Sequence, residues 1–271
     1  HRDLHSFPTR RSSDLADGVA ASAAKAVAED PHLNLIGLHS HIGSQIFDAA
    51  GFEVAAHRMA GLVADLVTDG HRIEELNLGG GMGIAYTPDD DPPRVQDMAK
   101  QLQSIVTREC ELAGVPVPRL AVEPGRAIVG SAGITVYEVG TVKTVDRGGR
   151  SRLYVSVDGG MSDNIRTALY GADYTVVLAG RNSSAEPVLS RVVGKHCESG
   201  DVVVRDAWLP GDGPPGALLA VAANGAYCRS MASNYNYVPR PAVVAALDGS
   251  CSVVLHRESL EDLIRGDAAF D

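Results

Sequence analysis

Short apolar runs alternate with longer amphipathic segments in the first half of the chain, and this alternation constrains the fold more than any other feature. Period-2 and period-3.6 patterns predict, in order, strand 33–38, helix 52–68, strand 75–78, helix 95–113 and strand 120–122. Strands that alternate with helices form parallel sheets covered by helices. We therefore expect functional groups at the carboxyl ends of these strands.

After Ala132 the pattern changes to β-branched strands separated by turns that contain glycine and proline. The expected strands are residues 134–145, 151–157, 202–205, 218–223 and 253–256, with a short helix at 259–265. We predict an α/β plus β fold, with a partial (β/α)8 TIM-type barrel at 16–131 and a mostly antiparallel C-terminal β domain at 132–271. The barrel is partial because only about three of eight strand–helix units are present.

Composition excludes several classes of protein. The net charge is -10, and no basic block is long enough to follow a nucleic-acid backbone. No apolar run approaches the roughly 20 residues of a membrane-spanning helix, so we expect no membrane partner and a cytoplasmic location. The four cysteines lack CxxC spacing, which predicts free thiols and no metal site. Residues 1–15 are polar and rich in arginine, and we interpret them as a non-native leader, with a short disordered arm as the alternative.

Two motifs follow expected strands and contain residues suited to binding a phosphorylated ligand. The glycine cluster 79–83 can bring backbone N–H groups close to a phosphate, although a tight turn without a ligand uses the same glycines. In Glu123-Pro124-Gly125-Arg126, the guanidinium can bind phosphate or carboxylate, and the carboxylate can hold a proton on a ring nitrogen. An ordinary Glu–Arg surface pair is the alternative.

His39 and His41 flank Ser40 after the first expected strand, so within a strand both imidazoles would face the same side. One imidazole could lie against an aromatic cofactor. A metal pair is an alternative, but no cluster of further ligands accompanies it, and a structural histidine is another.

The order of the three motifs, HIGS at 41–44, GGGMG at 79–83 and EPGR at 123–126, resembles the fold III pyridoxal-phosphate decarboxylases that act on diaminopimelate, ornithine or arginine. Three further segments resemble the diaminopimelate decarboxylases specifically: DGGMSDNIRTALYGA at 158–172, GKHCESGD at 194–201 and GAYCRSMASNYN at 225–236. The resemblance extends from about Leu33 to the C-terminus. It implies an enzyme that converts meso-2,6-diaminopimelate to L-lysine and CO2, the last step of lysine biosynthesis.

The resemblance also implies a pyridoxal 5'-phosphate site. His41 is expected to stack on the pyridine ring, and Glu123 to keep the ring nitrogen protonated, which makes the ring an electron sink. The phosphate is expected to contact Ser44, Gly81, the backbone of Gly125 and Arg126, and Tyr227. The alanine racemases of the same fold use an arginine at the ring nitrogen, so Glu123 favours decarboxylation.

For the substrate, the resemblance implies that Arg126, Arg166, Tyr170, Glu198 and Tyr227 bind diaminopimelate, whose distal end has both charges. Cys197 is the expected proton donor to the α-carbon, and it reaches the site of the other subunit in a homodimer. From the residues alone, Cys197 can equally be a buried, inert cysteine. Likewise Arg166 and Tyr170 share a face if the segment is helical, and are otherwise ordinary surface residues.

The chain departs from the family in one essential feature. The family binds its cofactor covalently through a lysine in a Tyr-Ala-x-Lys-Ala motif, which this sequence lacks; its lysines are Lys25, Lys100, Lys143 and Lys195. We therefore expect an N-terminally truncated chain that is inactive alone. An ornithine or arginine decarboxylase and a non-catalytic regulator of the same fold are the alternatives.

Overall fold

The computed structural model describes residues 18–146, 148–149 and 151–270, which form two compact units. Unit 1 comprises the residues up to 85 together with 89–128, and unit 2 comprises residues 86–88 and the chain from 129 onward. The expected leader, residues 1–15, lies outside the described residues.

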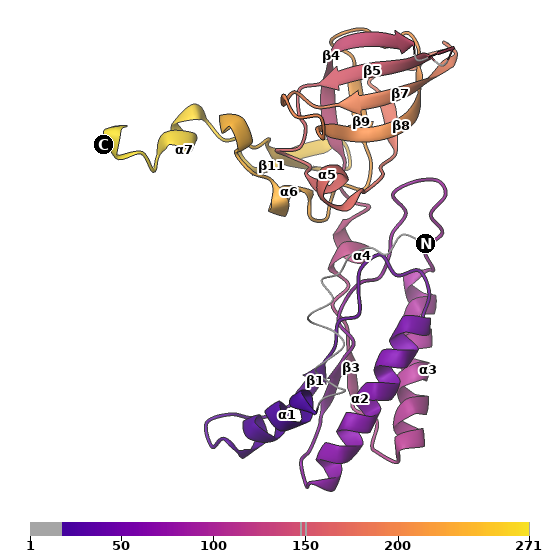
Figure 1. Ribbon diagram of the computed structural model, residues 1–271, viewed down its shortest axis with the longest axis vertical. Coiled ribbons are helices and arrows are strands. Elements are labelled where there is room, and N and C mark those ends of the chain that lie inside the picture. Colours follow the sequence, from indigo (N-terminus) through magenta and orange to yellow (C-terminus); the bar gives the residue numbers. More distant parts are fainter. Residues whose placement is uncertain (1–17, 147, 150, 271) are drawn as a thin grey trace. The chain divides into compact units, whose positions relative to one another are not determined.

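Unit 1 is a three-stranded parallel sheet with helices against it (Figure 1). Its elements are α1 (Val19–Glu29), β1 (Gly37–His39), α2 (Ala50–Thr68), β2 (Glu75–Asn77), α3 (Val95–Ala113), β3 (Arg119–Ala121) and α4 (Gly125–Val129). The strands are ordered β1-β2-β3, and Leu76 is the central residue that pairs with Leu38 on one side and Leu120 on the other.

The core of unit 1 lies between the sheet and the two long helices. The central leucine of each strand packs into it, and α2 and α3 contribute apolar residues at helical spacing, including Phe52, Val63, Leu102 and Val106. Because side chains alternate across a strand, the residues at the strand ends face away from this core. That other face is polar: it presents Glu75, Arg119, His39 and Asn77.

Unit 2 contains a six-stranded mixed sheet in the order β6-β9-β4-β5-β7-β8, which curls around a valine-rich core (Figure 1). Its strands are β4 (Thr135–Asp146), β5 (Ser151–Val157), β6 (Val176–Ala179), β7 (Pro187–Val193), β8 (Val202–Pro210) and β9 (Leu218–Val221). All neighbours in this sheet pair antiparallel except β5 and β7.

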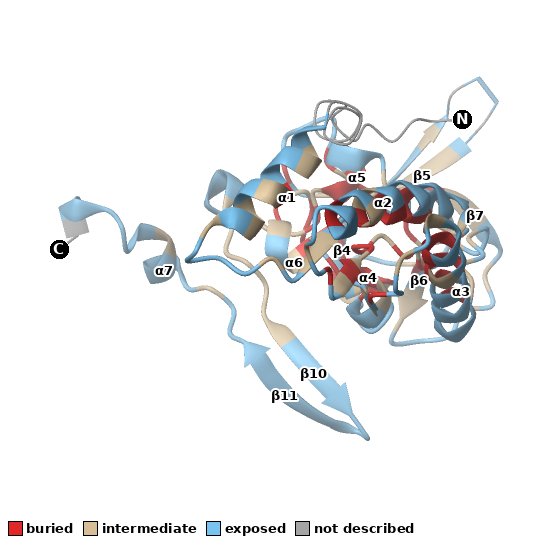
Figure 2. Ribbon diagram, turned by 90° about the horizontal axis from the view of Figure 1, so that it is seen from below, coloured by how far each residue is buried: buried red, intermediate tan, exposed pale blue. Residues whose placement is uncertain are grey.

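Short helices and a separate ribbon complete unit 2. These are α5 (Arg166–Tyr170), α6 (Cys228–Met231), the 3-10 helices η2 (Tyr235–Tyr237) and η3 (Ala268–Phe270), α7 (Leu260–Ile264), and the antiparallel pair β10 (Val243–Leu247) and β11 (Ser250–Leu255). Figure 2 shows that this ribbon is exposed along almost its whole length, with Val244 and Val253 about half exposed at 51% and 55%.

The fold class predicted from the sequence is confirmed: the structure has parallel strands with helices, followed by a largely antiparallel β region, and the parallel sheet is not closed. Helix α3 has the predicted limits, and α2 begins two residues earlier than predicted. The first strand is shorter than predicted, because Leu33 and Ile36 are exposed and pairing with β2 starts only at Gly37. No helix among the described residues is long and apolar enough to span a membrane.

Candidate functional site

Three turns meet at the carboxyl ends of β1, β2 and β3, where the sequence predicted a site. The glycine turn after β2 lies between the other two. On one side the Ile46 N–H donates to the Gly81 carbonyl over 2.8 Å and the Gly83 N–H donates to the Ile46 carbonyl over 2.9 Å. On the other side the Glu123 N–H donates to the Gly79 carbonyl over 2.8 Å. Residues far apart in the sequence are therefore fixed beside one another.

Glycine is required at two positions of this turn. Gly79 has φ +69° and Gly81 has φ +102°, both in the left-handed region that other residues rarely adopt. A Cβ on Gly81 would collide with the Gly43 carbonyl oxygen, and one on Gly79 would collide with the Ser40 carbonyl oxygen. The close approach of the turns thus depends on the absence of side chains.

Ser44 and Arg126 form the part of the site suited to an anion. The Arg126 Nη2 donates to the Ser44 Oγ over 2.6 Å, although the two residues are 82 positions apart. The Arg126 side chain comes from the short helix α4 and is 8% exposed, whereas Ser44 is exposed. A guanidinium beside a hydroxyl is a donor set that matches the acceptor oxygens of a phosphate.

His41 contacts the glycine turn directly. The Gly80 N–H donates to its Nδ1 over 3.2 Å, which places the proton of the neutral imidazole on Nε2. Strand β1 ends at His39, so the strand alternation expected to align the two imidazoles does not extend to His41, and that part of the prediction is wrong. Instead His39 lies near Glu123, with its Nε2 3.5 Å from the Glu123 Oε1.

In unit 2, Arg166 is buried at 7% exposure among aromatic rings. Its Nη1 donates to the Tyr174 hydroxyl over 2.5 Å, and its guanidinium carbon lies 5.0 Å from the ring centroid of Tyr86 and 5.8 Å from that of Tyr227. Burial, reinforced by Cys228, raises the pKa of Tyr174 well above its ordinary value, so this hydroxyl stays protonated.

No ion pair of the described residues involves Arg166, so its charge is met by ring faces and hydroxyls and not by a carboxylate. Such a guanidinium is prepared to bind a carboxylate ligand. The alternative of an ordinary surface residue is wrong for Arg166. Tyr170 ends the same helix, α5, but is 54% exposed.

A buried carboxylate, that of Asp201, holds the backbone conformation of the segment with Cys197 and Glu198. Asp201 accepts from the Met161 N–H over 2.6 Å and from the His196 N–H over 2.8 Å, and the His196 ring bonds to Ser162 over 2.9 Å. Cys197 and Glu198 are exposed, so the alternative of a buried cysteine is wrong.

Glu198 has a partner that the sequence did not predict. The Tyr235 hydroxyl donates to its Oε1 over 2.5 Å, and this bond raises the pKa of Tyr235. Asn77, Tyr86, Tyr174 and Tyr235 were all missed as site residues. Each contacts a predicted site residue. Only Tyr235 stands in a segment that carries the family resemblance, 225–236, and its contact with Glu198 spans 37 residues of sequence.

Neither lysine of unit 1 belongs to the three turns. In unit 1, Lys25 of α1 pairs with Asp69 over 2.5 Å, and Lys100 is an exposed residue of α3. The other two belong to unit 2, where Lys143 is in β4 and Lys195 follows β7. All four cysteines are free thiols, as predicted, and no cluster of potential metal ligands occurs among the described residues.

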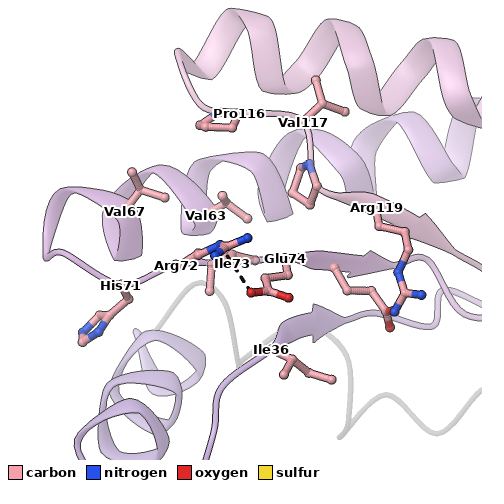
Figure 3. Close-up of a pocket in the computed structure, with 12 residues that line it drawn as sticks. Ile36, Val63, Val67, His71, Arg72, Ile73, Glu74, Pro116, Val117 and Arg119 are labelled. Carbon is pink, nitrogen blue, oxygen red and sulfur yellow. Dashed lines mark hydrogen bonds and ion pairs between the residues drawn. The ribbon is translucent and has the colours of Figure 1, made fainter.

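A cavity of about 670 Å³ in unit 1 lies at the opposite ends of the strands (Figure 3). It is lined by the starts of β2 and β3, by the end of α2 and by the segment between α3 and β3, with Val67, Pro116 and the paired Arg72 and Glu74 among its residues. In barrels of this type the amino ends of the strands serve stability, and the three turns are therefore the better candidate.

Comparisons with known proteins identify the family of the chain. Residues 15–130 match the family model described as "Pyridoxal-dependent decarboxylase, pyridoxal binding domain". The chain is 57% identical over 256 residues to the diaminopimelate decarboxylase of Mycobacterium tuberculosis, a match that covers 92% of this chain and 57% of the relative. It is 43% identical over 259 residues to that of Bacillus subtilis, covering 95% and 58% respectively.

Solved structures give the same result. The diaminopimelate decarboxylase from M. jannaschii in complex with L-lysine has a TM-score of 0.84 and 33% identity, over 93% of this chain and 56% of that chain. The Helicobacter pylori enzyme complexed with L-lysine has a TM-score of 0.81 and 29% identity, over 94% and 60%. The chain thus spans somewhat more than half the length of the relatives it matches. It belongs to the pyridoxal-dependent decarboxylase family and, within that family, to the diaminopimelate decarboxylases.

Proposed function

We propose that this chain provides the cofactor-binding and substrate-binding parts of a pyridoxal 5'-phosphate enzyme that decarboxylates meso-2,6-diaminopimelate to L-lysine and CO2. The observation that supports it most is the meeting of the three turns around residues 79–81, with a phosphate-type donor set on one side and a carboxylate on the other. The proposal includes a cytoplasmic homodimer, as the family resemblance implies.

The residues present fit the non-covalent part of a pyridoxal-phosphate site. Ser44 and Arg126 supply the phosphate donors, and the turn at Gly81 has no side chain that would occupy the space beside them. The backbone at Gly125 and the hydroxyl of Tyr227 complete the proposed phosphate contacts. His41 is proposed to lie against the ring, held by its bond to Gly80.

Bound pyridoxal phosphate would supply a protonated ring that accepts the electron pair left by departing CO2. The chain's own task is to hold the charges and protons in place. Glu123 would hold the proton at the pyridine nitrogen, and Cys197, presented to the partner subunit's site, would return a proton to the substrate α-carbon.

We propose that the substrate is selected by side chains whose charges are opposite to those of its distal carboxylate and ammonium groups. Arg166 and Arg126 would bind the distal carboxylate, with Tyr170 and Tyr227 beside it, and Glu198 would bind the distal ammonium group. The charge of Arg166 is buried and is not neutralised by a carboxylate of the described residues, which supports this assignment, since a desolvated guanidinium gains most from an incoming carboxylate. Ornithine lacks that carboxylate, so we expect these residues to bind ornithine more weakly than diaminopimelate.

A non-catalytic role for this chain by itself is the second candidate, since its 271 residues contain no Tyr-Ala-x-Lys-Ala motif. A covalent link needs a desolvated lysine beside the ring, and Lys25 and Lys100 of unit 1 lie on helices. We therefore expect that borohydride treatment of the chain with pyridoxal phosphate modifies no single lysine selectively, as judged by peptide mass spectrometry. Selective and stoichiometric labelling, with production of lysine, would contradict this expectation.

The function itself is tested in a fusion that supplies the family's lysine. The segment of the M. tuberculosis relative with the Tyr-Ala-x-Lys-Ala motif is fused to residues 16–271, and release of CO2 and lysine from meso-diaminopimelate is measured. We expect activity on diaminopimelate and little on ornithine or arginine. The Cys197→Ala variant should lose roughly 10²–10⁴-fold in kcat, whereas Cys251→Ala, an exposed cysteine on β11, should retain it. A folded fusion without activity, or one that prefers ornithine, would overturn the proposal.

A further inference from the structure

Polar side chains form a row across the polar face of the parallel sheet, which is the face opposite the core of unit 1. The row lies next to the three turns. His39 and Asn77 pair in register at the ends of β1 and β2, and Asn77 also pairs with Ala121 of β3. Glu123 follows two residues after Ala121, so its carboxylate stands at the top of this row. The arrangement brings an imidazole and an amide to one glutamate.

The Asn77 side chain can be oriented in only one way. Its Oδ1 accepts from the Gly79 N–H over 2.8 Å, and its Nδ2 donates to the Glu123 Oε1 over 3.0 Å. A backbone N–H can only donate and an ionised carboxylate can only accept, so a flipped amide would lose both bonds. Asn77 therefore links the glycine turn to the carboxylate.

The two oxygens of Glu123 have different surroundings. Oε1 accepts from Asn77 and lies 3.5 Å from the His39 Nε2, whereas no hydrogen bond to Oε2 is formed by the described residues. The Glu123 side chain is 56% exposed, so packing alone does not fix its rotamer. The contacts at Oε1 are what hold the carboxylate in one orientation.

We propose that Asn77, assisted by His39, is a positioning residue that holds Glu123 by one oxygen and leaves Oε2 to accept the N–H of the cofactor's pyridine ring. This rests on the proposed function for the identity of the ring. The geometric part, a bond between Asn77 and Glu123, stands independently of any cofactor.

The first experiment tests that bond in the chain without cofactor. In amide NMR spectra of the 271-residue chain, the side-chain NH2 signals of Asn77 should shift in Glu123→Ala, because their acceptor is removed. They should stay unchanged in Glu111→Ala, an exposed carboxylate on α3. If the chemical shifts of the Asn77 NH2 group are unchanged in Glu123→Ala, the inference is overturned.

The second experiment separates positioning from support of the turn. Asn77→Asp keeps an acceptor for the Gly79 N–H but replaces the donor that faces Glu123 with a second carboxylate. We expect roughly tenfold weaker binding of pyridoxal phosphate and a bound-state absorption spectrum that differs from that of the wild type. Wild-type affinity and spectrum in this variant would mean that Asn77 serves the turn alone and would overturn the inference.

The two failures are distinguishable. If the wild-type chain does not bind pyridoxal phosphate, the proposed function fails, and the NMR comparison still decides whether Asn77 holds Glu123. If the Asn77→Asp chain does not fold, as judged by its amide spectrum, the Glu123→Ala comparison alone decides the inference.

Discussion

A single carboxylate, Asp201, determines the conformation of the segment that presents Cys197 and Glu198. Its Oδ1 and Oδ2 accept from different backbone N–H groups, those of Met161 and His196, and the residue is 3% exposed. Both donors would be buried without a partner if the carboxylate were lost, which is costly. Asp201 thus couples the proposed catalytic segment to the turn after β5.

We predict that Asp201→Asn destabilises the protein by about 2 kcal/mol. An amide has one acceptor oxygen, so one of the two N–H groups would face an NH2 group and lose its bond. Urea unfolding followed by circular dichroism measures the effect. Asp206→Asn, at an exposed carboxylate of β8, is the matched control and should change the unfolding free energy little. Equal stability of the two variants would contradict this account.

The chemistry-bearing residues were predictable from sequence, but their supporting contacts were not. Ser44, Glu123 and Arg126 stand in short motifs that follow strands, and the family resemblance assigns them roles. Asn77 and Tyr235 contact Glu123 and Glu198 across 46 and 37 residues. Contacts of that separation depend on strand register and loop path, which local patterns do not specify.

Among the elements, α2 and α3 show why helices were predicted better than strands. Their buried residues recur every three or four positions, as in Phe52, Ala56, Met59 and Val63. A helix can therefore be recognised from the spacing of apolar residues within its own sequence. The strands of unit 1 have three residues each, and their limits depend on where a neighbour pairs. Strands β6, β7 and β10 were not predicted, because their formation also depends on pairing with neighbouring strands.

The α2–α3 pair also includes an ion-pair network around one buried carboxylate, whose two partners are exposed. Glu109 of α3 occupies the apolar stripe at 6% exposure, where it bonds to His57 of α2 over 2.9 Å and to Arg108 over 2.8 Å. Hydrogen bonds from His57 and then Arg108 lower the pKa of Glu109. Its ionised form is therefore favoured in the folded protein.

We predict that Glu109→Gln lowers the urea midpoint at pH 7 and that the difference from wild type shrinks in acid. A carboxylate with a depressed folded pKa stabilises the protein above its unfolded pKa, about 4.3, and this contribution is lost as the pH falls through the folded pKa. Urea unfolding at several pH values between 7 and 3 measures it. Glu111→Gln, an exposed neighbour, is the control. A gap that stays constant down to pH 3 would contradict the assignment.

For the whole molecule, the sequence predicted the class of fold, and the structure adds the mixed pairing of the β region. The parallel strands β1 and β3 each pair on one side only among the described strands, and the ribbon of β10 and β11 has both faces exposed. The chain spans 57% of the length of the M. tuberculosis relative. The proposed activity therefore belongs to a longer protein, whereas the cofactor turns can be tested in this chain.

The three turns of unit 1 are proposed to bind the phosphate of pyridoxal phosphate. The most direct measurement is a ³¹P NMR titration of pyridoxal phosphate with the purified chain. We predict a saturable change of the phosphate signal that is weakened about tenfold or more in Ser44→Ala and Arg126→Lys, but not in Arg181→Ala, whose arginine pairs with Asp212 in unit 2. A signal that does not saturate, or equal binding by all these proteins, would contradict the account.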